Sequence, residues 1–244
     1  MDATGGTRGV EQRGRARIDD HAGQRRRPSG EPPALPHELG RSGKFLLLML
    51  LYFVLVLTGF LLFPSLEGVF ERLDHGRQVR ITDLRSPGLT RVMLAVNGLA
   101  SSWSIRLIRW GVILGLVVFR RWRHLLVFLG AIILTEIVAY NASTLISRPR
   151  PLGIEILTGW QGYSMPSRPL AGLAVSAVGA AYALIVAGRP RSIAKWAIGI
   201  VLAVLVFARV YLGVDHTTDA VMGAVFGVAV GVAIQTRSNV CASS

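Results

Sequence analysis

The stretch Arg209-Val-Tyr-Leu-Gly-Val-Asp-His-Thr-Thr-Asp219 lies between two apolar runs near the C-terminus. Charged side chains next to segments apolar enough to cross a membrane cost free energy to bury. This stretch therefore indicates a functional site. Two other polar stretches, 141–151 and 163–169, border apolar runs in the same way. We expect the three stretches to converge.

The composition predicts a polytopic membrane protein. The 244 residues are 51% hydrophobic, with a mean hydropathy of +0.47, which is too apolar for an ordinary soluble domain. Of the formal charge of +13, residues 1–44 contribute nine Lys/Arg and six Asp/Glu, so +10 remains in the apolar part. These charges are scattered between apolar runs, a pattern that disfavours a nucleic-acid partner and favours anionic membrane lipids and phosphate ligands.

Six apolar runs predict transmembrane helices, because about 20 apolar residues cross roughly 30 Å of hydrocarbon. The sequence therefore predicts an all-α fold, a polytopic bundle of about six transmembrane helices. The expected spans are 45–63, 103–119, 125–147, 170–187, 196–210 and 220–234.

The segments outside the spans divide the chain into three parts. Residues 1–43 are rich in Arg, Gly, Pro and Asp without hydrophobic periodicity, which predicts a disordered, basic cytoplasmic tail. Residues 44–236 form the expected transmembrane domain, and 237–244 form a short C-terminal tail. Between the first two spans, 64–88 is expected to be a polar loop. Helical spacing of apolar residues then predicts an interfacial amphipathic helix carrying Leu89, Val92, Met93, Val96, Leu99 and Ala100.

Three charged residues besides Arg209 fall inside expected spans. Arg106 and Arg109 lie in the first two turns of the second span, where snorkelling would keep them solvated. Glu136 lies within the third span. An acid at that depth is neutral, paired or directed into the bundle, and both a structural hydrogen bond and a role near the site stay open.

The distribution of Lys and Arg predicts the orientation. With the N-terminal tail on one side, that side carries sixteen Lys and Arg, against eight in the loops of the other side. We therefore expect a multi-pass protein of the cell membrane with a cytoplasmic N-terminus. All three polar stretches then face the extracytoplasmic side.

Four arginines at the ends of expected helices predict an anion pocket. Arg148, Arg150, Arg168 and Arg209 would repel one another unless an anion lay between them. The planar guanidinium matches phosphate oxygens, and Ser167 opens the fourth helix, where free backbone N–H groups also favour an anion. The alternative is that the arginines only anchor helix ends at the membrane interface.

The three stretches together resemble the type 2 phosphatidic acid phosphatase (PAP2) family. That family carries K-x6-R-P, P-S-G-H and S-R-x5-H-x3-D in this order, on a bundle of about six helices. The resemblance covers residues 45–236. It implies that Arg148, Ser167, Arg209 and Asp219 hold phosphate or orient the nucleophile.

The family's catalytic positions are substituted in this chain. Asn141 stands at the lysine position, which we still assign to phosphate binding together with Arg168. Pro169 stands where the family has the histidine that protonates the leaving group. Asp215 stands at the position of the nucleophilic histidine, and His216 follows it.

Two routes to catalysis stay open in the sequence. In one, His216 acts as the nucleophile with Asp219 as its orienting partner. In the other, Asp215 attacks phosphorus and His216 serves as acid and base. The three residues could also ligate a metal, but the nearby arginines oppose a cation, so we expect neither metal nor cofactor.

The predicted function is the handling of a lipid phosphate or lipid diphosphate, such as a polyprenyl or glycerolipid phosphate, by an atypical or very slow phosphatase or phosphotransferase. The alternative is a catalytically degenerate relative that binds or senses lipid phosphates without hydrolysing them. Whether the protein is an enzyme stays open at this point.

Overall fold

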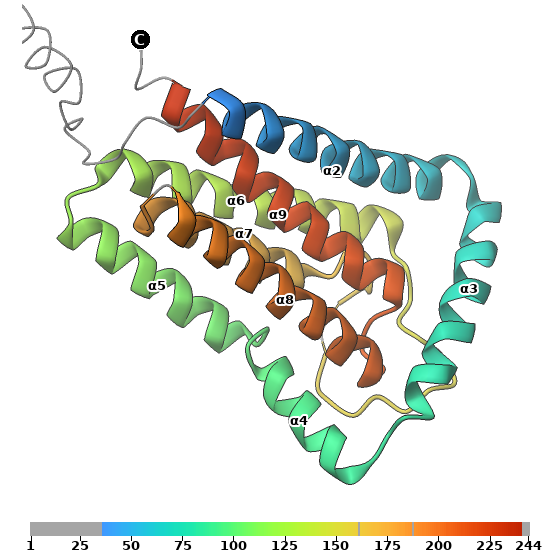
Figure 1. The fold of residues 1–244 in the computed structure, drawn as a ribbon. Helices are drawn as coiled ribbons and strands as arrows, with labels where there is room; N and C mark the ends of the chain where they lie inside the picture. Colours follow the sequence, from blue (N-terminus) through green and yellow to red (C-terminus); the bar gives the residue numbers. More distant parts are fainter. Residues whose placement is uncertain (1–35, 161, 187, 241–244) are drawn as a thin grey trace, which may run out of the picture. The chain divides into compact units, whose positions relative to one another are not determined.

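The computed structural model describes residues 36–160, 162–186 and 188–240, and the regular secondary structure of these residues is entirely helical. Figure 1 shows the helices in chain order. They are α2 (Pro36–Leu62), α3 (Pro64–Thr82), α4 (Pro87–Gly98), α5 (Ser102–Val118), α6 (Trp122–Ile146), α7 (Arg168–Leu184), α8 (Arg189–Tyr211) and α9 (Thr217–Val240).

A helix overlaps each of the six expected spans, but not all of these helices are long and apolar enough to cross a membrane by themselves. By length and composition, α6 and α8 can each cross a membrane, and α4 with α5 makes a third candidate span bent by 41°. Shorter apolar segments occupy Leu46–Gly59, Arg168–Leu184 and Thr217–Ala233. The chain is therefore an all-α membrane protein built as a helical bundle.

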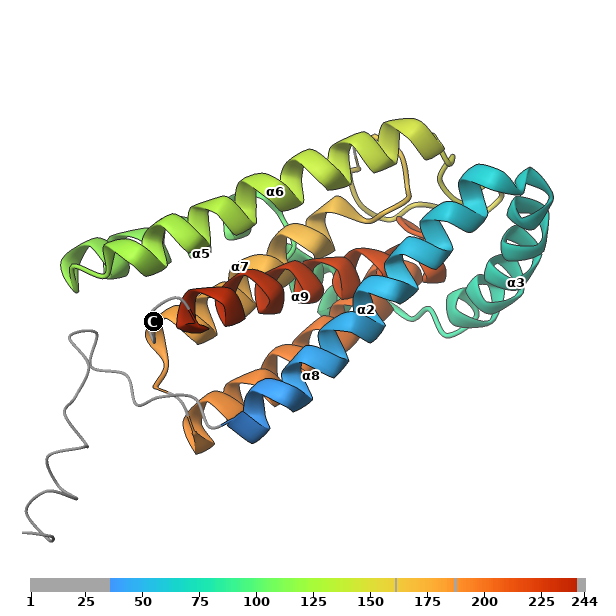
Figure 2. The same cartoon turned by 90° about the horizontal axis from the view of Figure 1, so that it is seen from above.

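Helix α7 is the centre of the bundle. It packs against α5, α6, α8 and α9, and most of its residues are buried (Figure 2). Its contact with α9 is especially close, because a Cβ at Gly223 would lie 2.3 Å from the Ser167 carbonyl oxygen and one at Gly227 would lie 2.3 Å from that of Ala171. Glycine is needed at both positions for the two backbones to approach.

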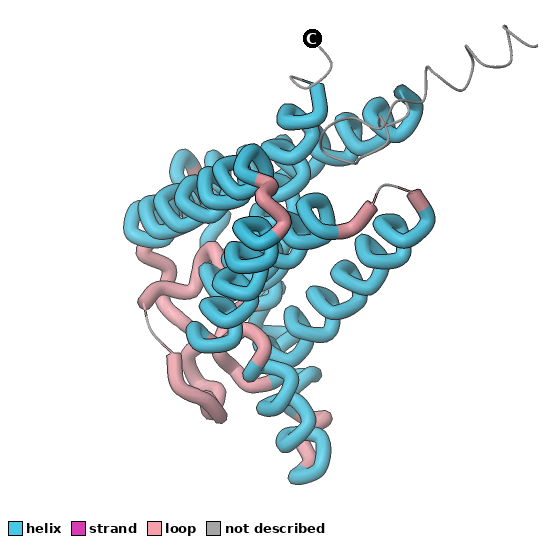
Figure 3. The backbone as a smooth tube through the Cα atoms, turned by 90° about the vertical axis from the view of Figure 1, so that its left-hand side faces the viewer, coloured by secondary structure: helices cyan, strands magenta, loops and turns pink. Residues whose placement is uncertain are grey.

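The three polar stretches meet at one end of the bundle. The backbone N–H of Ser164 donates to the carbonyl of Arg148 over 3.1 Å, and that of Ser167 donates to the carbonyl of Asp219 over 3.1 Å. The long α6–α7 segment, drawn as loop in Figure 3, is also bonded to the end of α8 through Leu157 and Leu212. Residues distant in sequence therefore form one local structure there.

The segment 64–88, expected to be a loop, contains helix α3. Pro64 opens this helix at a position where its missing N–H costs nothing. The helix is polar on most sides, so the apolar periodicity that reveals an amphipathic helix is absent from its sequence. Asp74 and Gln78, one turn apart, are nevertheless fully buried and face α9 and the α8–α9 loop. The amphipathic helix expected after it corresponds to α4, which ends before Leu99 and Ala100, and its position at the membrane interface stays a prediction.

The tail boundaries differ from those expected. Helix α2 begins at Pro36, so the segment 36–43, assigned to a disordered tail, is helical. The remainder of that prediction, 1–35, lies outside the described residues. At the other end α9 continues to Val240, past the expected start of the C-terminal tail at residue 237, and 241–244 lie outside the described residues.

Candidate anion-binding site

The carboxylate of Asp215 is fully buried among three donors from three parts of the chain. Arg209, in the last turn of α8, places Nε 2.5 Å from Oδ2 and Nη2 3.2 Å from Oδ1. Arg150, from the α6–α7 loop, places Nη1 2.7 Å from Oδ1. The hydroxyl of Ser167, the N-cap residue of α7, donates to Oδ2 over 2.6 Å.

These contacts keep Asp215 ionised. Burial alone would raise the pKa of its carboxyl, but the charges and hydrogen bonds of Arg209, Arg150 and Ser167 hold that pKa below its usual value. A permanent anion therefore lies among three donors, of which the resemblance to the family assigns Arg209 and Ser167 to phosphate.

A second buried cluster surrounds Arg148, whose side chain is 2% exposed. Its guanidinium pairs with Asp219 through Nη1 and with Asp74 of α3 through Nη2, the latter over 3.1 Å. Ser164 donates to the other Asp219 oxygen over 2.5 Å, and Thr218 donates to Asp74 over 2.5 Å. Arg148 is thus held by two carboxylates, and it does not line the cavity described below.

His216 is buried beside this second cluster, with 6% of its surface exposed. Its imidazole has a hydrogen bond to the backbone of Pro149, and its Nδ1 has no hydrogen-bond partner among the described residues. Burial, followed by the positive charge of Arg148, lowers the pKa of His216 to about 4. The imidazole is therefore neutral near pH 7, and the Asp219 carboxylate is directed to Arg148 and Ser164 instead of to this histidine.

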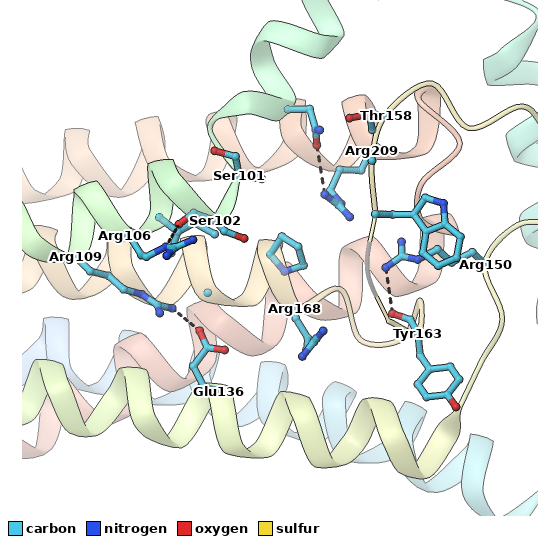
Figure 4. A pocket seen from close by; sticks show the side chains of 17 residues that line it. Ser101, Ser102, Arg106, Arg109, Glu136, Arg150, Thr158, Tyr163, Arg168 and Arg209 are labelled. Carbon is cyan, nitrogen blue, oxygen red and sulfur yellow. Dashed lines mark hydrogen bonds and ion pairs between the residues drawn. The ribbon is translucent and has the colours of Figure 1, made fainter.

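A cavity of about 730 Å³ lies next to the Asp215 cluster (Figure 4). Arg168 is half-buried at its edge, with its guanidinium 5.7 Å from the ring centre of Tyr140. In the part of the chain that the structure describes, Arg168 pairs with no carboxylate. The charged residues that line the cavity are Arg106, Arg109, Glu136, Arg150, Arg168 and Arg209.

Two charged residues of the expected spans form an ion pair in this cavity. Nη2 of Arg109 lies 2.6 Å from Oε1 of Glu136, and Nε of Arg109 donates to Ser176 over 3.1 Å. Arg109 is therefore turned into the bundle instead of snorkelling to the interface. Of the two roles left open for Glu136, the structure shows a structural ion pair that also borders the cavity.

The residues predicted at the family's lysine and acid positions lie in different places relative to the cavity. Asn141 is exposed on α6, its amide donates to the carbonyl of Ile137 over 2.7 Å, and it does not line the cavity. Pro169 lines the cavity wall. Within the described residues, no group of three or more His, Cys, Asp or Glu side chains is placed to hold a metal ion.

Several contacts of the site have no counterpart among the residues singled out in the sequence. Asp74 lies on a helix whose polar sequence gave no periodic signal. Ser164 and Thr218 lie within the polar stretches 163–169 and 209–219, but nothing in a single sequence separates them from ordinary loop residues. Asn97 of α4 accepts a hydrogen bond from Arg209 over 3.3 Å. The sequence of α4 showed only the periodicity of its apolar face, which gives no sign of this contact.

Comparison with known proteins identifies the fold. A family model described as the PAP2 superfamily matches residues 124–239. A search of curated protein sequences gave no match.

Two solved structures resemble the chain. One is the transmembrane PAP2-type phosphatidylglycerolphosphate phosphatase of Bacillus subtilis, with a TM-score of 0.60 and 21% identity, covering 78% of this chain and 93% of that one. The other is LpxE of Aquifex aeolicus, with a TM-score of 0.53 and 21% identity, covering 66% of this chain and 94% of that one. The PAP2 superfamily model therefore matches the part of this membrane protein in which the three polar stretches meet, and the fold resembles that of the two solved structures.

Proposed function

We propose that this protein binds the phosphate of a membrane lipid and does not hydrolyse it. Of the two functions that the sequence left open, the catalytically degenerate binder has the stronger support. The observation that carries it is the buried Asp215 carboxylate, which holds Arg150, Arg209 and Ser167 in the way that a phosphate would.

The geometry gives little support to either catalytic route. Both oxygens of Asp215 already accept hydrogen bonds from cations, which lowers its nucleophilicity. No hydrogen bond joins His216 to Asp219 among the described residues. Pro169 has no proton to give a leaving group. A general acid is worth about 10²–10⁴ in rate, and loss of a covalent nucleophile can cost about 10⁶.

The lipid phosphate is proposed to bind in the cavity beside Asp215. Arg168 has no carboxylate partner there, and it precedes Pro169 at the start of α7, where free N–H groups favour an anion. Arg209 reaches the same cavity, so the two guanidinium groups can share one phosphate. The Bacillus subtilis protein that the chain resembles is a transmembrane PAP2-type phosphatase of phosphatidylglycerolphosphate, which supports a lipid ligand.

We further propose a multi-pass arrangement with the N-terminus in the cytoplasm and the site on the extracytoplasmic side. The excess of Lys and Arg at the α5–α6 and α7–α8 ends supports it. Cysteine-accessibility labelling of intact cells should reach a cysteine introduced at Gly159 and miss one at Ser192. If the cysteine introduced at Ser192 were labelled and the one at Gly159 were not, the protein would have the opposite orientation in the membrane.

Binding and turnover should be measured on one preparation of purified protein, with farnesyl phosphate as the probe. We expect saturable binding and no release of inorganic phosphate above a protein-free blank. Arg168→Gln should weaken binding by about tenfold or more, since a charge-assisted bond contributes about 1.5–3 kcal/mol. Arg123→Gln, at the opposite end of the bundle, is the matched control. Absence of binding would refute the proposal, and phosphate release lost in His216→Ala would establish the slow enzyme instead.

A further inference from the structure

Helix α3 contacts the α8–α9 loop through two buried polar side chains. The helix lies across the polar end of the bundle, against α8 and α9 (Figure 1). Asp74 and Gln78, one turn apart, are fully buried, whereas the other residues of 68–82 are at least partly exposed. Both precede residue 124, where the match to the PAP2 superfamily model begins. The contact is therefore a feature of this chain that the matched family model does not cover.

Asp74 caps α9 from outside that helix. The N–H of Ala220 donates to the carbonyl of His216, so His216 is the N-cap residue. Its imidazole has no oxygen to accept the free N–H groups of the first turn. Asp74 Oδ1 accepts the N–H of Thr218 over 3.3 Å, and Oδ2 accepts the Thr218 hydroxyl over 2.5 Å. A carboxylate of α3 therefore does what an N-cap side chain does in other helices.

Gln78 holds the same loop just before His216. Its Nε2 donates to the backbone carbonyl oxygen of Asp215 over 3.4 Å. Its Oε1 has no partner among the described residues, and a buried polar atom without a partner costs free energy. An apolar side chain of similar size would avoid that cost. The bond to the Asp215 backbone is therefore what the glutamine contributes here.

The Asp215 residue lies between two anchors of the loop. Before it, the N–H of Val214 donates to the carbonyl of Arg209, and Arg150 donates to the carbonyl of Val214 over 2.6 Å. At Asp215 and after it, the backbone is held by Gln78 and Asp74 of α3. The carboxylate of Asp215 extends from this fixed backbone to Arg150 and Arg209. Its alignment with the two guanidinium groups therefore depends on α3.

We propose that Asp74 and Gln78 are positioning residues of the site, and that α3 sets how firmly Asp215 holds Arg150 and Arg209. This inference rests on the proposed function, in which a lipid phosphate competes with that carboxylate for Arg209. A loop released from α3 lets the carboxylate move away from the guanidinium groups, which then bind a phosphate more readily. Helix α3 thereby limits the affinity of the site.

Farnesyl phosphate binding in a double-mutant cycle with Asp215 tests the positioning role. Gln78→Met and Asp74→Ala should each raise the affinity of the full-length protein about two- to tenfold, the range for one hydrogen bond. Asp74→Asn should have a smaller effect, because its amide oxygen still accepts the Thr218 N–H. In the Asp215→Asn background these changes should leave the affinity unaltered, because the carboxylate that they position is gone. Arg77→Gln, on the exposed face of α3, is the matched control.

Hydrogen exchange without lipid gives a second measure of the same role. The amides of 215–218 should exchange about two- to tenfold faster in Gln78→Met and in Asp74→Ala, because the loop then opens more often. Exchange in Arg77→Gln should equal that of the unmodified protein. This measurement reports on the loop itself and does not require a ligand.

The outcomes distinguish the inference from the proposed function. Unchanged or weaker binding by Gln78→Met and Asp74→Ala, with a lower melting temperature, would show that α3 only stabilises the fold and overturns the inference. An equal change of affinity in the Asp215→Asn background overturns it as well, since the effect would not pass through Asp215. In both cases the lipid-phosphate site stands. Failure of the unmodified protein and of every variant to bind farnesyl phosphate overturns the proposed function and the inference together.

Discussion

Arg209 holds both carboxylate oxygens of Asp215, with Nε 2.5 Å from Oδ2 and Nη2 3.2 Å from Oδ1. In the PAP2 signature these two positions carry an arginine for phosphate and the nucleophilic histidine. Here an anion of the protein itself engages that arginine. We therefore expect the substitution to remove the nucleophile and also to occupy part of the proposed phosphate site.

Asp215→Asn should strengthen the binding of farnesyl phosphate. The amide keeps the size of the side chain but frees the charges of Arg150 and Arg209, so we expect an affinity gain of about tenfold or more. The same change leaves buried cations unpaired and should lower the free energy of unfolding by about 3–5 kcal/mol. Titration and thermal unfolding measure the two effects. Asp83→Asn, which removes an exposed charge, should change neither.

Arg148→Met should destabilise the fold with little effect on lipid binding. The change leaves Asp74 and Asp219 buried without their cation, at a cost of about 3–5 kcal/mol. The residue does not line the cavity, so the affinity of the protein that remains folded should be preserved. A tenfold loss of affinity in a folded variant would place Arg148 in the binding site after all.

His216 should make the protein sensitive to acid. Its pKa is about 4 in the folded protein and about 6.5 in an unfolded chain, so the unfolded state takes up a proton first. Stability is unaffected above pH 6.5 and falls as the pH drops from 6.5 toward 4, by about 3 kcal/mol in total.

Thermal unfolding at pH 7.5 and pH 4.5 checks this dependence. His216→Gln should lose less stability on acidification than the unmodified protein does, while His75→Gln, on the exposed side of α3, should behave like the unmodified protein. Identical acid sensitivity of all three proteins would contradict the assignment of a neutral, buried imidazole.

Gly223→Ala should separate α7 from α9 and disturb the site. The added methyl group would lie 2.3 Å from the Ser167 carbonyl oxygen, and such overpacking costs about 1–3 kcal/mol. The displacement should also weaken lipid-phosphate binding, because Ser167 begins α7 beside Asp215. Gly199→Ala on α8 is the control, since a Cβ there meets no atom within 4 Å. Equal melting temperatures for the two variants would show that the close approach is not needed.

The fold could be predicted largely from the sequence. The apolar runs predict the helices, and the spacing of the three polar stretches predicts the resemblance to the PAP2 family. The stretch around Arg209 and Asp219 predicted where the bundle has its polar end. Helix α3 could not be predicted, because its buried Asp74 is surrounded by polar residues that hide the helical period.

The site could be predicted only in part. A motif names the residues of a pocket but not how their charges pair. The pattern placed Arg148 and Arg209 together among residues that hold phosphate or orient the nucleophile, whereas Arg148 is held by two buried carboxylates and Arg209 reaches the cavity. That difference depends on Asp74, which is far away in the sequence. Arg109 and Glu136 lie on different helices, so their ion pair was likewise visible only in three dimensions.

The central claim is that the protein holds a lipid phosphate without hydrolysing it because the catalytic histidines are missing. The release of inorganic phosphate from farnesyl phosphate tests it most directly, compared between the unmodified protein and the double variant Asp215→His, Pro169→His, which keeps Arg168. We predict no release by the unmodified protein and clear turnover by the variant, since restored nucleophile and acid positions would act in a scaffold that already binds phosphate. Robust release by the unmodified protein, abolished by His216→Ala, would contradict the account.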